Sequence, residues 1–449
     1  MNAELDELPR RKRWPWLILF LAVGGFAAFW FSQRTQSKPE AAQRFLFRKK
    51  LPAWVAAQSI HHPRASDFLA ECVELAQPWP AVASALEKLP DAWDSEPELR
   101  AVTKELNDAL HAASLDFWVD PQFFNKRPIL TTHEILSRAT WRTETASTEA
   151  LHVRRLDTLN LGLGMLGHAS GDHPAILRDR IEVMVMTRLS ADVGNDVDRL
   201  VGKLWRAQLG KLIGPDGIAE AERRLAERDR LARAMENRLK GGEIRIPQPE
   251  RLVFGDEYFE ALEPYTSTRR RGGPLLILSD LRALQRADEA LDDSVGLKAL
   301  VQAIDLEAAM VEAHEARHAL EPEDFPTPAL LQSLVGEDDL SFGKSAAREL
   351  RAFLGELRDA HPPACLSVLA LAEAARGRYA DSTPHFFAAH ALLSTMAARE
   401  APRGLSLEQV VEVTTELCAL PEAELRERAN QAAITLYGAP LSAAKREGP

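Results

Sequence analysis

The stretch VQAIDLEAAMVEAHEARHAL (residues 301–320) decides how the rest of this sequence is interpreted. It contains neither proline nor glycine, and Ala, Leu, Glu and Met dominate it, so it predicts a helix. At about 100° per residue, Ile304 and Ala308 fall on the side expected to face a core. The same spacing continues onto Glu315 and His318. The sequence therefore places polar side chains on the buried side of a helix.

Within this helix, AHEARHAL sets two histidines four residues apart, and a glutamate directly follows the first. Buried imidazole and carboxylate groups are costly unless they are paired or bound to a metal. Histidines at positions i and i+4 project from one face of a helix, so His314 and His318 can both reach one zinc ion at about 2 Å. Glu315 is then placed to act as the general base toward a water molecule that the metal activates.

A catalytic zinc ion needs a third protein ligand. No histidine follows His318 within HALEPEDFPTP, so a glutamate from a later helix is the expected ligand. KSAARELRAFLGELRDAH predicts such a helix, and Glu349 borders its apolar stripe. Glu356 on the same stripe and Glu373 in CLSVLALAEAA are the alternatives.

Peptide hydrolysis also requires a hydrogen-bond donor to the developing oxyanion. Tyr379, His385 and His390, within GRYADSTPHFFAAHALL, follow the predicted ligand helices and are the candidates, with Tyr379 preferred. The alternative interpretation is that His385 and His390 are hydrogen-bonded core residues beside Phe386.

The AHEARHAL segment resembles the HExxH helix of the zincin superfamily of metallopeptidases, and a glutamate ligand on a later helix resembles the gluzincin subgroup. The resemblance covers this helix and the one after it. Arg317 is charged where the family has an uncharged residue, and Glu312 is acidic where an uncharged residue is expected. Both are predicted to point away from the buried side, as is Asp305. The resemblance implies a small sheet beside the first active-site helix.

Near the start of the chain, WPWLILFLAVGGFAAFWF (residues 14–31) contains no charged residue. At about 1.5 Å per residue it would span roughly 27 Å, close to the thickness of a bilayer's hydrocarbon core. No good signal cleavage site follows, so residues 14–32 predict an uncleaved single-pass anchor. The basic RRKR directly before it favours a cytoplasmic N-terminus, with the bulk of the chain outside the inner membrane in the periplasm.

Composition and charge exclude several classes of protein. With 46% hydrophobic and 27% charged residues, the chain is expected to fold rather than remain disordered. The formal net charge of −11 argues against a nucleic-acid partner. GLGMLG (residues 162–167) fits GxGxxG, but Gly171, Asp172 and Pro174 would prevent a helix from starting there, so a turn is predicted and no nucleotide cofactor.

The three cysteines are Cys72, Cys365 and Cys418, and their odd number and wide spacing argue against a disulfide framework. Each is expected to be a small buried residue, with one bridge possible in an oxidising compartment. A long charged helix is predicted over residues 214–240, with a narrow apolar stripe. It is interpreted as a solvent-facing spacer, with an interaction arm as the alternative.

The predicted fold class is mainly α with a minor β part (α+β), whose strands lie within residues 117–161. The expected organisation is a tail over 1–13, an anchor over 14–32, a linker over 33–44, a helical region with a few strands over 45–210, the spacer helix over 214–240 and a helical zincin-like domain over 250–449.

Together, these expectations predict a membrane-anchored zinc metallopeptidase that acts on peptide or protein substrates. Zn²⁺ would be held by His314, His318 and Glu349. Glu315 would take a proton from the attacking water and pass it to the leaving amine. The alternative is a non-catalytic, membrane-anchored helical binding or scaffold protein with a structural metal site or none.

Overall fold

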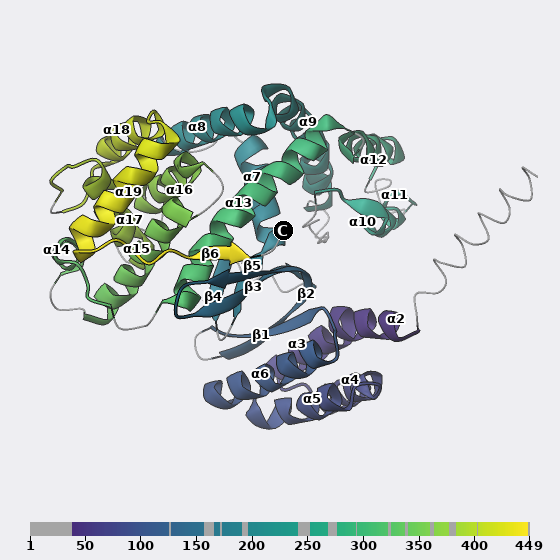
Figure 1. The fold of residues 1–449 in the computed structure, drawn as a ribbon. Coiled ribbons are helices and arrows are strands. Elements are labelled where there is room, and N and C mark those ends of the chain that lie inside the picture. Colours follow the sequence, from purple (N-terminus) through teal and green to yellow (C-terminus); the bar gives the residue numbers. More distant parts are fainter. Residues whose placement is uncertain are drawn as a thin grey trace, which may run out of the picture. The chain divides into compact units, whose positions relative to one another are not determined.

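The computed structural model describes residues 38–124, 127–156, 166–170, 173–190, 196–240, 252–267, 276–292, 294–321, 325–336, 340–359, 363–376, 383–401 and 403–447. The described chain is mostly helical with one small sheet (Figure 1), which confirms the predicted mainly-α class with a minor β part. Internal contacts divide it into two compact units. The first is Met1–Glu134 with Arg155–Asn160, and the second is Ile135–Arg154 with Leu161–Pro449.

The first unit is a set of short helices followed by a β-hairpin. Its elements are α2 (Lys38–Phe45), the π-helix η1 (Leu46–Lys50), α3 (Leu51–Ser59), α4 (Ala65–Ala76), α5 (Pro80–Ala92), α6 (Glu96–Ala112), β1 (Phe117–Phe124) and the first half of β2 (Arg127–Arg142). Strands β1 and β2 pair antiparallel, with Phe117 opposite Glu134 and Phe124 opposite Arg127. Trp54 and Trp93 meet edge to face in the core, with ring centroids 5.2 Å apart.

The second unit contains the rest of the sheet. Its strands are the far end of β2, β3 (Ser147–Arg155), β4 (Gly167–Ser170), β5 (His173–Leu177) and β6 (Lys445–Glu447). The order is β2–β3–β5–β4, with β6 paired to β2; β3 and β5 run parallel, whereas β4 is antiparallel to β5. The strands predicted within residues 117–161 are therefore present. Strands β4, β5 and β6 were not predicted, because three to five residues carry too little alternation to be recognised.

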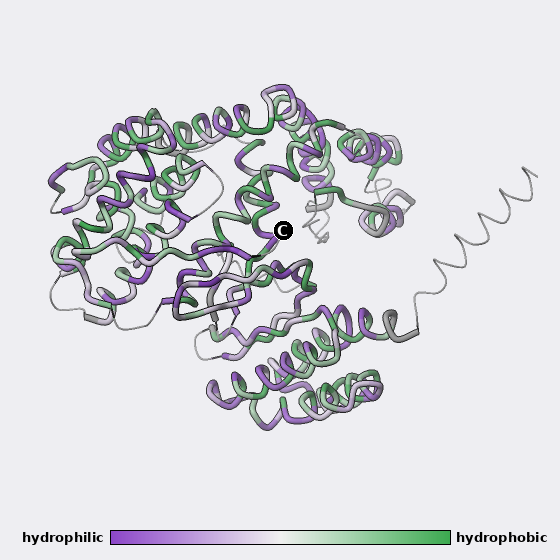
Figure 2. The backbone as a smooth tube through the Cα atoms, viewed as in Figure 1, coloured by the Kyte–Doolittle hydropathy of each residue, from purple (hydrophilic) through white to green (hydrophobic). Residues whose placement is uncertain are grey.

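Thirteen described helices complete the second unit (Figure 1). They are α7 (Arg178–Ser190), α8 (Asp196–Ile213), α9 (Pro215–Lys240), α10 (Gly255–Leu262), α11 (Pro264–Ser267), α12 (Leu278–Asp292), α13 (Val295–Leu320), α14 (Ala329–Val335), α15 (Leu340–Asp359), α16 (Ala364–Arg376), α17 (Pro384–Met396), α18 (Leu407–Cys418) and α19 (Glu422–Tyr437). Hydrophobic and hydrophilic residues alternate along these helices in Figure 2. Most of them therefore present one apolar side to a shared core.

Helix α9 has the predicted position but is not a solvent-facing spacer. Its stripe residues Ile218 and Leu225 are buried in the core of the second unit, and so is Ala221 between them. A Cβ atom added at Gly296 of α13 would lie 2.9 Å from the backbone nitrogen of Ala221. The two helices therefore touch through their backbones. The spacer interpretation was wrong because the buried face of α9 includes small alanines. Alanines pack against α13 but add little to the hydrophobic pattern of the sequence.

Two of the three cysteines form a disulfide. Cys365 of α16 is bonded to Cys418 of α18, across 53 positions of sequence, so the possibility of a single bridge is realised. Cys72 is free and buried in α4, where burial raises the pKa of its thiol to about 12. A thiol with this pKa is protonated at neutral pH and is a poor nucleophile or metal ligand.

The predicted anchor over residues 14–32 lies outside the described residues. Within the described ranges, no helix has the length and apolar character that crossing a membrane would need. In the GLGMLG motif, Gly162 and Gly164 also lie outside the described residues, whereas Gly167 begins strand β4 rather than a helix.

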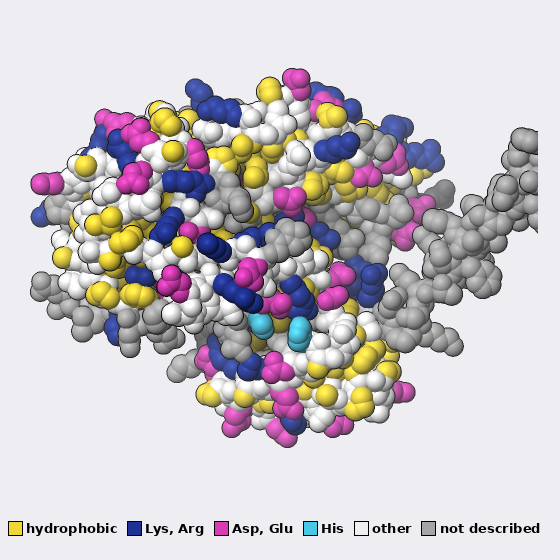
Figure 3. Space-filling model, in the orientation of Figure 1, with side chains coloured by type: hydrophobic (Ala, Val, Ile, Leu, Met, Phe, Trp, Pro, Cys, Tyr) yellow, Lys and Arg dark blue, Asp and Glu magenta, His cyan; other side chains and the backbone are white. Residues whose placement is uncertain are grey.

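The molecular face drawn in Figure 3 carries Lys and Arg side chains interspersed with Asp and Glu. Many of the exposed charges are paired along single helices, for example Arg100 with Glu96 at 2.9 Å and Arg428 with Glu424 at 3.3 Å. Such exposed pairs each contribute little to stability. The fold therefore depends on its buried cores.

Candidate metal centre

Two neighbouring helices of the second unit bring the predicted ligands together. His314 and His318 lie one turn apart on α13, which begins at an N-cap where the Ser294 side chain accepts from the backbone N–H of Leu297. Glu349 lies on α15, which packs beside α13. The Nε2 atoms of the two histidines lie 3.2 Å and 3.3 Å from the same Glu349 Oε2.

The donor set and its spacing fit a zinc ion. His314, His318 and Glu349 each offer one ligand atom, and these atoms all lie within 4.8 Å of one another. Two ligand atoms bound about 2.0–2.1 Å from a tetrahedral zinc ion are about 3.3 Å apart. Both nitrogen-to-oxygen distances match this value, and the mixed nitrogen and oxygen set is one that zinc accepts. These residues can therefore hold zinc with little rearrangement.

The electrostatics of the side chains at the centre show what a cation would replace. Burial alone would lower the pKa of His314, but the carboxylates of Glu349 and Glu356 outweigh it and raise that pKa to about 10. Burial would raise the pKa of Glu349, but hydrogen bonds from His314 and His318 hold it well below its usual range. The centre thus favours a proton on His314, and a metal ion must displace that proton to bind.

The two alternative glutamates occupy other positions. Glu356 is buried and its Oε2 lies 3.3 Å from Nδ1 of His314, on the side of the ring opposite Glu349. It is therefore placed to orient the imidazole rather than to compete with Glu349 for the metal. Glu373 on α16 forms an ion pair with Arg188, which also donates to the buried Glu307 at 2.9 Å.

The predicted general base, Glu315, lies beneath strand β4. Its side chain is buried, with 9% of the residue exposed. A Cβ atom added at Gly167 would lie 2.8 Å from Cγ of Glu315 and 2.7 Å from Cγ1 of Val311. Only a glycine lets the strand approach the helix this closely. The third glycine of GLGMLG therefore serves the contact between β4 and α13, which the sequence pattern did not reveal.

The candidate oxyanion donors fall in three different situations. Tyr379 lies outside the described residues. His390 is a hydrogen-bonded core residue, because its Nε2 donates to the carbonyl of Ala375 at 3.0 Å and its Nδ1 accepts from the N–H of Leu405 at 2.9 Å. His385, in the first turn of α17, lies at the metal centre, with its Nε2 3.0 Å from Oε2 of Glu349. The side chain of His385 is 53% exposed, but desolvation of the part that faces the centre lowers its pKa.

Glu312 is buried, although the helical arithmetic predicted that it points away from the buried side. It accepts hydrogen bonds from Nε1 of Trp141 at 2.6 Å and from Nε of Arg446 at 2.7 Å, and it lies 2.6 Å from Nε2 of His152. Strands β2, β3 and β6 supply these partners. One acidic side chain of α13 therefore joins the helix to the sheet.

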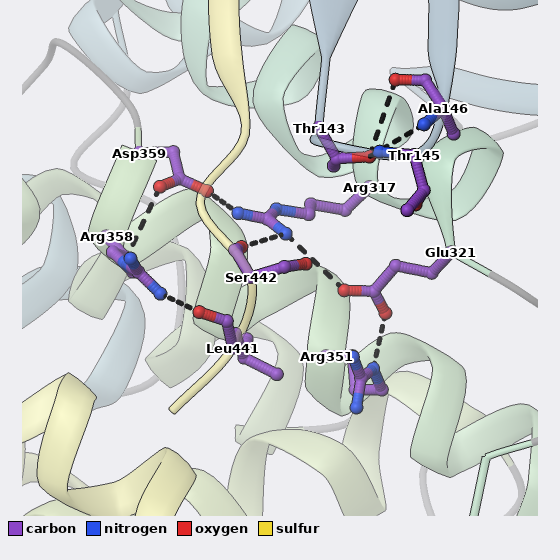
Figure 4. Close-up of polar contacts among 10 residues, drawn as sticks. All are labelled: Thr143, Thr145, Ala146, Arg317, Glu321, Arg351, Arg358, Asp359, Leu441 and Ser442. Atoms are coloured by element: carbon purple, nitrogen blue, oxygen red, sulfur yellow. Dashed lines mark hydrogen bonds and ion pairs between the residues drawn. The ribbon is translucent and has the colours of Figure 1, made fainter. Parts of the chain in front are cut away.

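Arg317, which lies between the two histidines in sequence, is also buried rather than exposed. Figure 4 shows its polar contacts. It forms an ion pair with Asp359 at the end of α15, and it donates to the carbonyl of Ser442 at 2.8 Å. Arg358 donates to the neighbouring carbonyl of Leu441. The predictions for Glu312 and Arg317 failed for one reason. Other elements cover helix α13 on several sides, so residues that lie off its apolar stripe are also buried there.

No family model matches this chain, and neither does any curated protein or any solved structure.

Proposed function

We propose that this chain is a zinc-dependent metallopeptidase with a centre formed by His314, His318 and Glu349. The convergence of two imidazole nitrogens on one carboxylate oxygen carries this proposal. A zinc ion bound there would polarise a carbonyl group and lower the pKa of water toward neutrality. The separate buried carboxylate of Glu315, directly after the first histidine, supports a catalytic rather than a purely structural use of the site.

The chain's own residues divide the work of hydrolysis. Glu315 holds the proton removed from the attacking water and returns it to the leaving amine. Glu356 holds the His314 ring through Nδ1, so that Nε2 faces Glu349. Glu349 supplies the negative charge that a cation requires. This division places the base and the ligands on two packed helices, which restricts their motion.

Strand β4 supports a peptide as the substrate class. It ends the described sheet order with β5 as its neighbour, so its other edge has no strand partner among the described residues. A strand edge without a strand partner can pair with an extended peptide through backbone hydrogen bonds. Gly167 holds this strand against Glu315. A peptide added to that edge would therefore run close to the proposed base.

The test compares the full-length chain with Glu315→Gln and with the control Asp305→Asn, an exposed position of the same helix that pairs with Arg178 away from the centre. Zinc per chain is measured by elemental analysis, and cleavage is followed with a peptide library. We expect about one zinc per chain in all three proteins and loss of hydrolysis in Glu315→Gln alone. A Glu315→Gln variant that cleaves as fast as the parent would refute the role of the base.

The alternative is a non-catalytic helical scaffold with a structural zinc site. The position of His385 favours it, because a fourth protein donor beside the other three is typical of closed structural sites. Zinc retained in every variant, without hydrolysis by the parent, would support this alternative.

We also propose that the protein is anchored in the inner membrane by residues 14–32, with its bulk in the periplasm. The Cys365–Cys418 disulfide supports this, because disulfides persist in oxidising compartments. When thiols are alkylated in intact cells and the protein is then studied by mass spectrometry, both cysteines should remain unmodified until the disulfide is reduced. Free thiols at both positions would argue for a reducing compartment.

A further inference from the structure

We infer that His385 is a fourth, displaceable protein ligand of the metal centre. The inference rests on the proposed zinc site. It adds that, before substrate binds, the site is in a resting state with four protein ligands. His385 would occupy the coordination position that hydrolysis requires, and its ring would have to leave before a substrate could be processed.

The geometry of Glu349 supports this assignment. Three imidazole Nε2 atoms surround its Oε2, from His314 at 3.2 Å, His318 at 3.3 Å and His385 at 3.0 Å. Each distance is close to the edge of about 3.3 Å expected between two ligands of a tetrahedral zinc ion. The rings of His314 and His385 are nearly parallel, at 11°, with centroids 6.2 Å apart. The ring of His385 would have to move inward, toward the other two imidazoles, to bring four donors around one ion.

The burial of the four side chains indicates which ligand can leave. The side chains of His314 and His318 are 10% and 8% exposed and that of Glu349 is 15% exposed, whereas that of His385 is 53% exposed. His385 also lies outside the group of three whose ligand atoms are all within 4.8 Å of one another. It is thus the outermost donor, and its ring can swing toward solvent without opening the core.

The location of His385 in the fold also suits a movable ligand. It lies in the first turn of α17, one residue after Pro384, where the Thr383 side chain caps the helix by accepting from the N–H of Phe386. His314 and Glu349 lie in interior turns of α13 and α15, and His318, in the last turn of α13, has a side chain that is only 8% exposed. Rotation of one side chain at a helix start costs much less than displacement of a residue within a packed helix.

The test uses the full-length chain, freed of metal and loaded with Co²⁺ alone. Proton relaxation of bulk water reports whether a water molecule is coordinated to the cobalt, and visible absorption reports the coordination number. The variants are His385→Ala and His385→Gln, and the control is His111→Ala, an exposed histidine of the first unit. Glutamine preserves a hydrogen bond to Glu349 but is a poor cobalt ligand.

We expect no coordinated water in the parent and in His111→Ala. Both His385 variants should gain a coordinated water, and their affinity for Zn²⁺ should fall by about 10- to 100-fold. Added imidazole should reverse both changes in His385→Ala. Coordinated water already present in the parent would overturn the inference, and so would a His385→Gln variant that behaves like the parent. Failure of the parent to bind Co²⁺ or Zn²⁺ would instead remove the metal centre itself.

Discussion

Substitution of Gly355 by alanine tests the packing of the two ligand helices most directly. Gly355 lies on α15, six residues after Glu349, and the Arg317 side chain of α13 passes directly over it. A Cβ atom at this position would lie 2.5 Å from Nε and 2.7 Å from Cδ of Arg317, against the 3.4 Å at which ordinary contact begins. The helices or the arginine would therefore have to move by nearly 1 Å.

The arginine cannot move away freely. Its side chain is 1% exposed, and its guanidinium group is held by Asp359 and by the carbonyl of Ser442 (Figure 4). Overpacking of this kind costs about 1–3 kcal/mol. Alanine regains about 1 kcal/mol of helix propensity over glycine. We therefore expect Gly355→Ala to lower the free energy of unfolding by up to about 2 kcal/mol.

Gly343→Ala is the matched control, because it makes the same substitution in the same helix. Its added Cβ atom would have Thr327 as its nearest neighbour, with Cγ2 at 3.8 Å, which is an ordinary contact. Alanine should therefore stabilise the protein there by up to about 1 kcal/mol. The two substitutions should change stability in opposite directions.

Urea unfolding of both metal-free variants, compared with the parent, measures this difference. Zinc titration of the folded proteins then tests whether displacement of α15 also weakens the site through Glu349. If Gly355→Ala proves as stable as Gly343→Ala, the side chain of Arg317 does not lie as close to α15 as described. The proposed alignment of Glu349 with the two histidines would lose its support as well.

Three further predictions concern the centre itself. Glu356→Gln should weaken Zn²⁺ binding by about 10- to 100-fold, measured by competition with a chromogenic chelator, because the carboxylate no longer orients His314; unchanged affinity would refute that role. In the metal-free protein, the folded-state pKa of His314 is raised from 6.5 to about 10, so its stabilising contribution is complete below pH 6.5 and is lost as the pH rises toward 10. Urea unfolding at pH 7 and pH 9 should show this loss in the parent, and the His314→Gln variant should lack this component. Gly167→Ala should reduce peptide cleavage while leaving zinc content unchanged, because its Cβ atom would push β4 away from Glu315; a fully active variant would contradict the proposed substrate strand.

The sequence predicted those features that depend on local patterns. The helical regularity of residues 301–320 is realised in α13, and the charged helix over 214–240 is realised in α9. Strands β1, β2 and β3 lie within the predicted β region. Short-range periodicity is sufficient for such elements, because each spans several turns or several alternations of polarity.

The surroundings of α13 could not be predicted in this way. A helical wheel assigns one side to the core and the other to solvent, and on that basis Glu312 and Arg317 were expected to be exposed. Both are buried, because β6 and the segment around Ser442 return from the end of the chain to cover them. The closeness of Gly167 to Glu315 also depends on a strand that was too short to be recognised.

By itself, the sequence determined that His314 and His318 share one face of a helix, because positions i and i+4 of any α-helix do so. It also determined that Glu349 lies on a second amphipathic helix. Only the tertiary structure decided that Glu349 faces Nε2 of His314, that Glu356 lies behind the same ring, and that His385 joins from a third helix. These relations arise from packing between segments far apart in the chain, and no local pattern of residues encodes the distance between two helices.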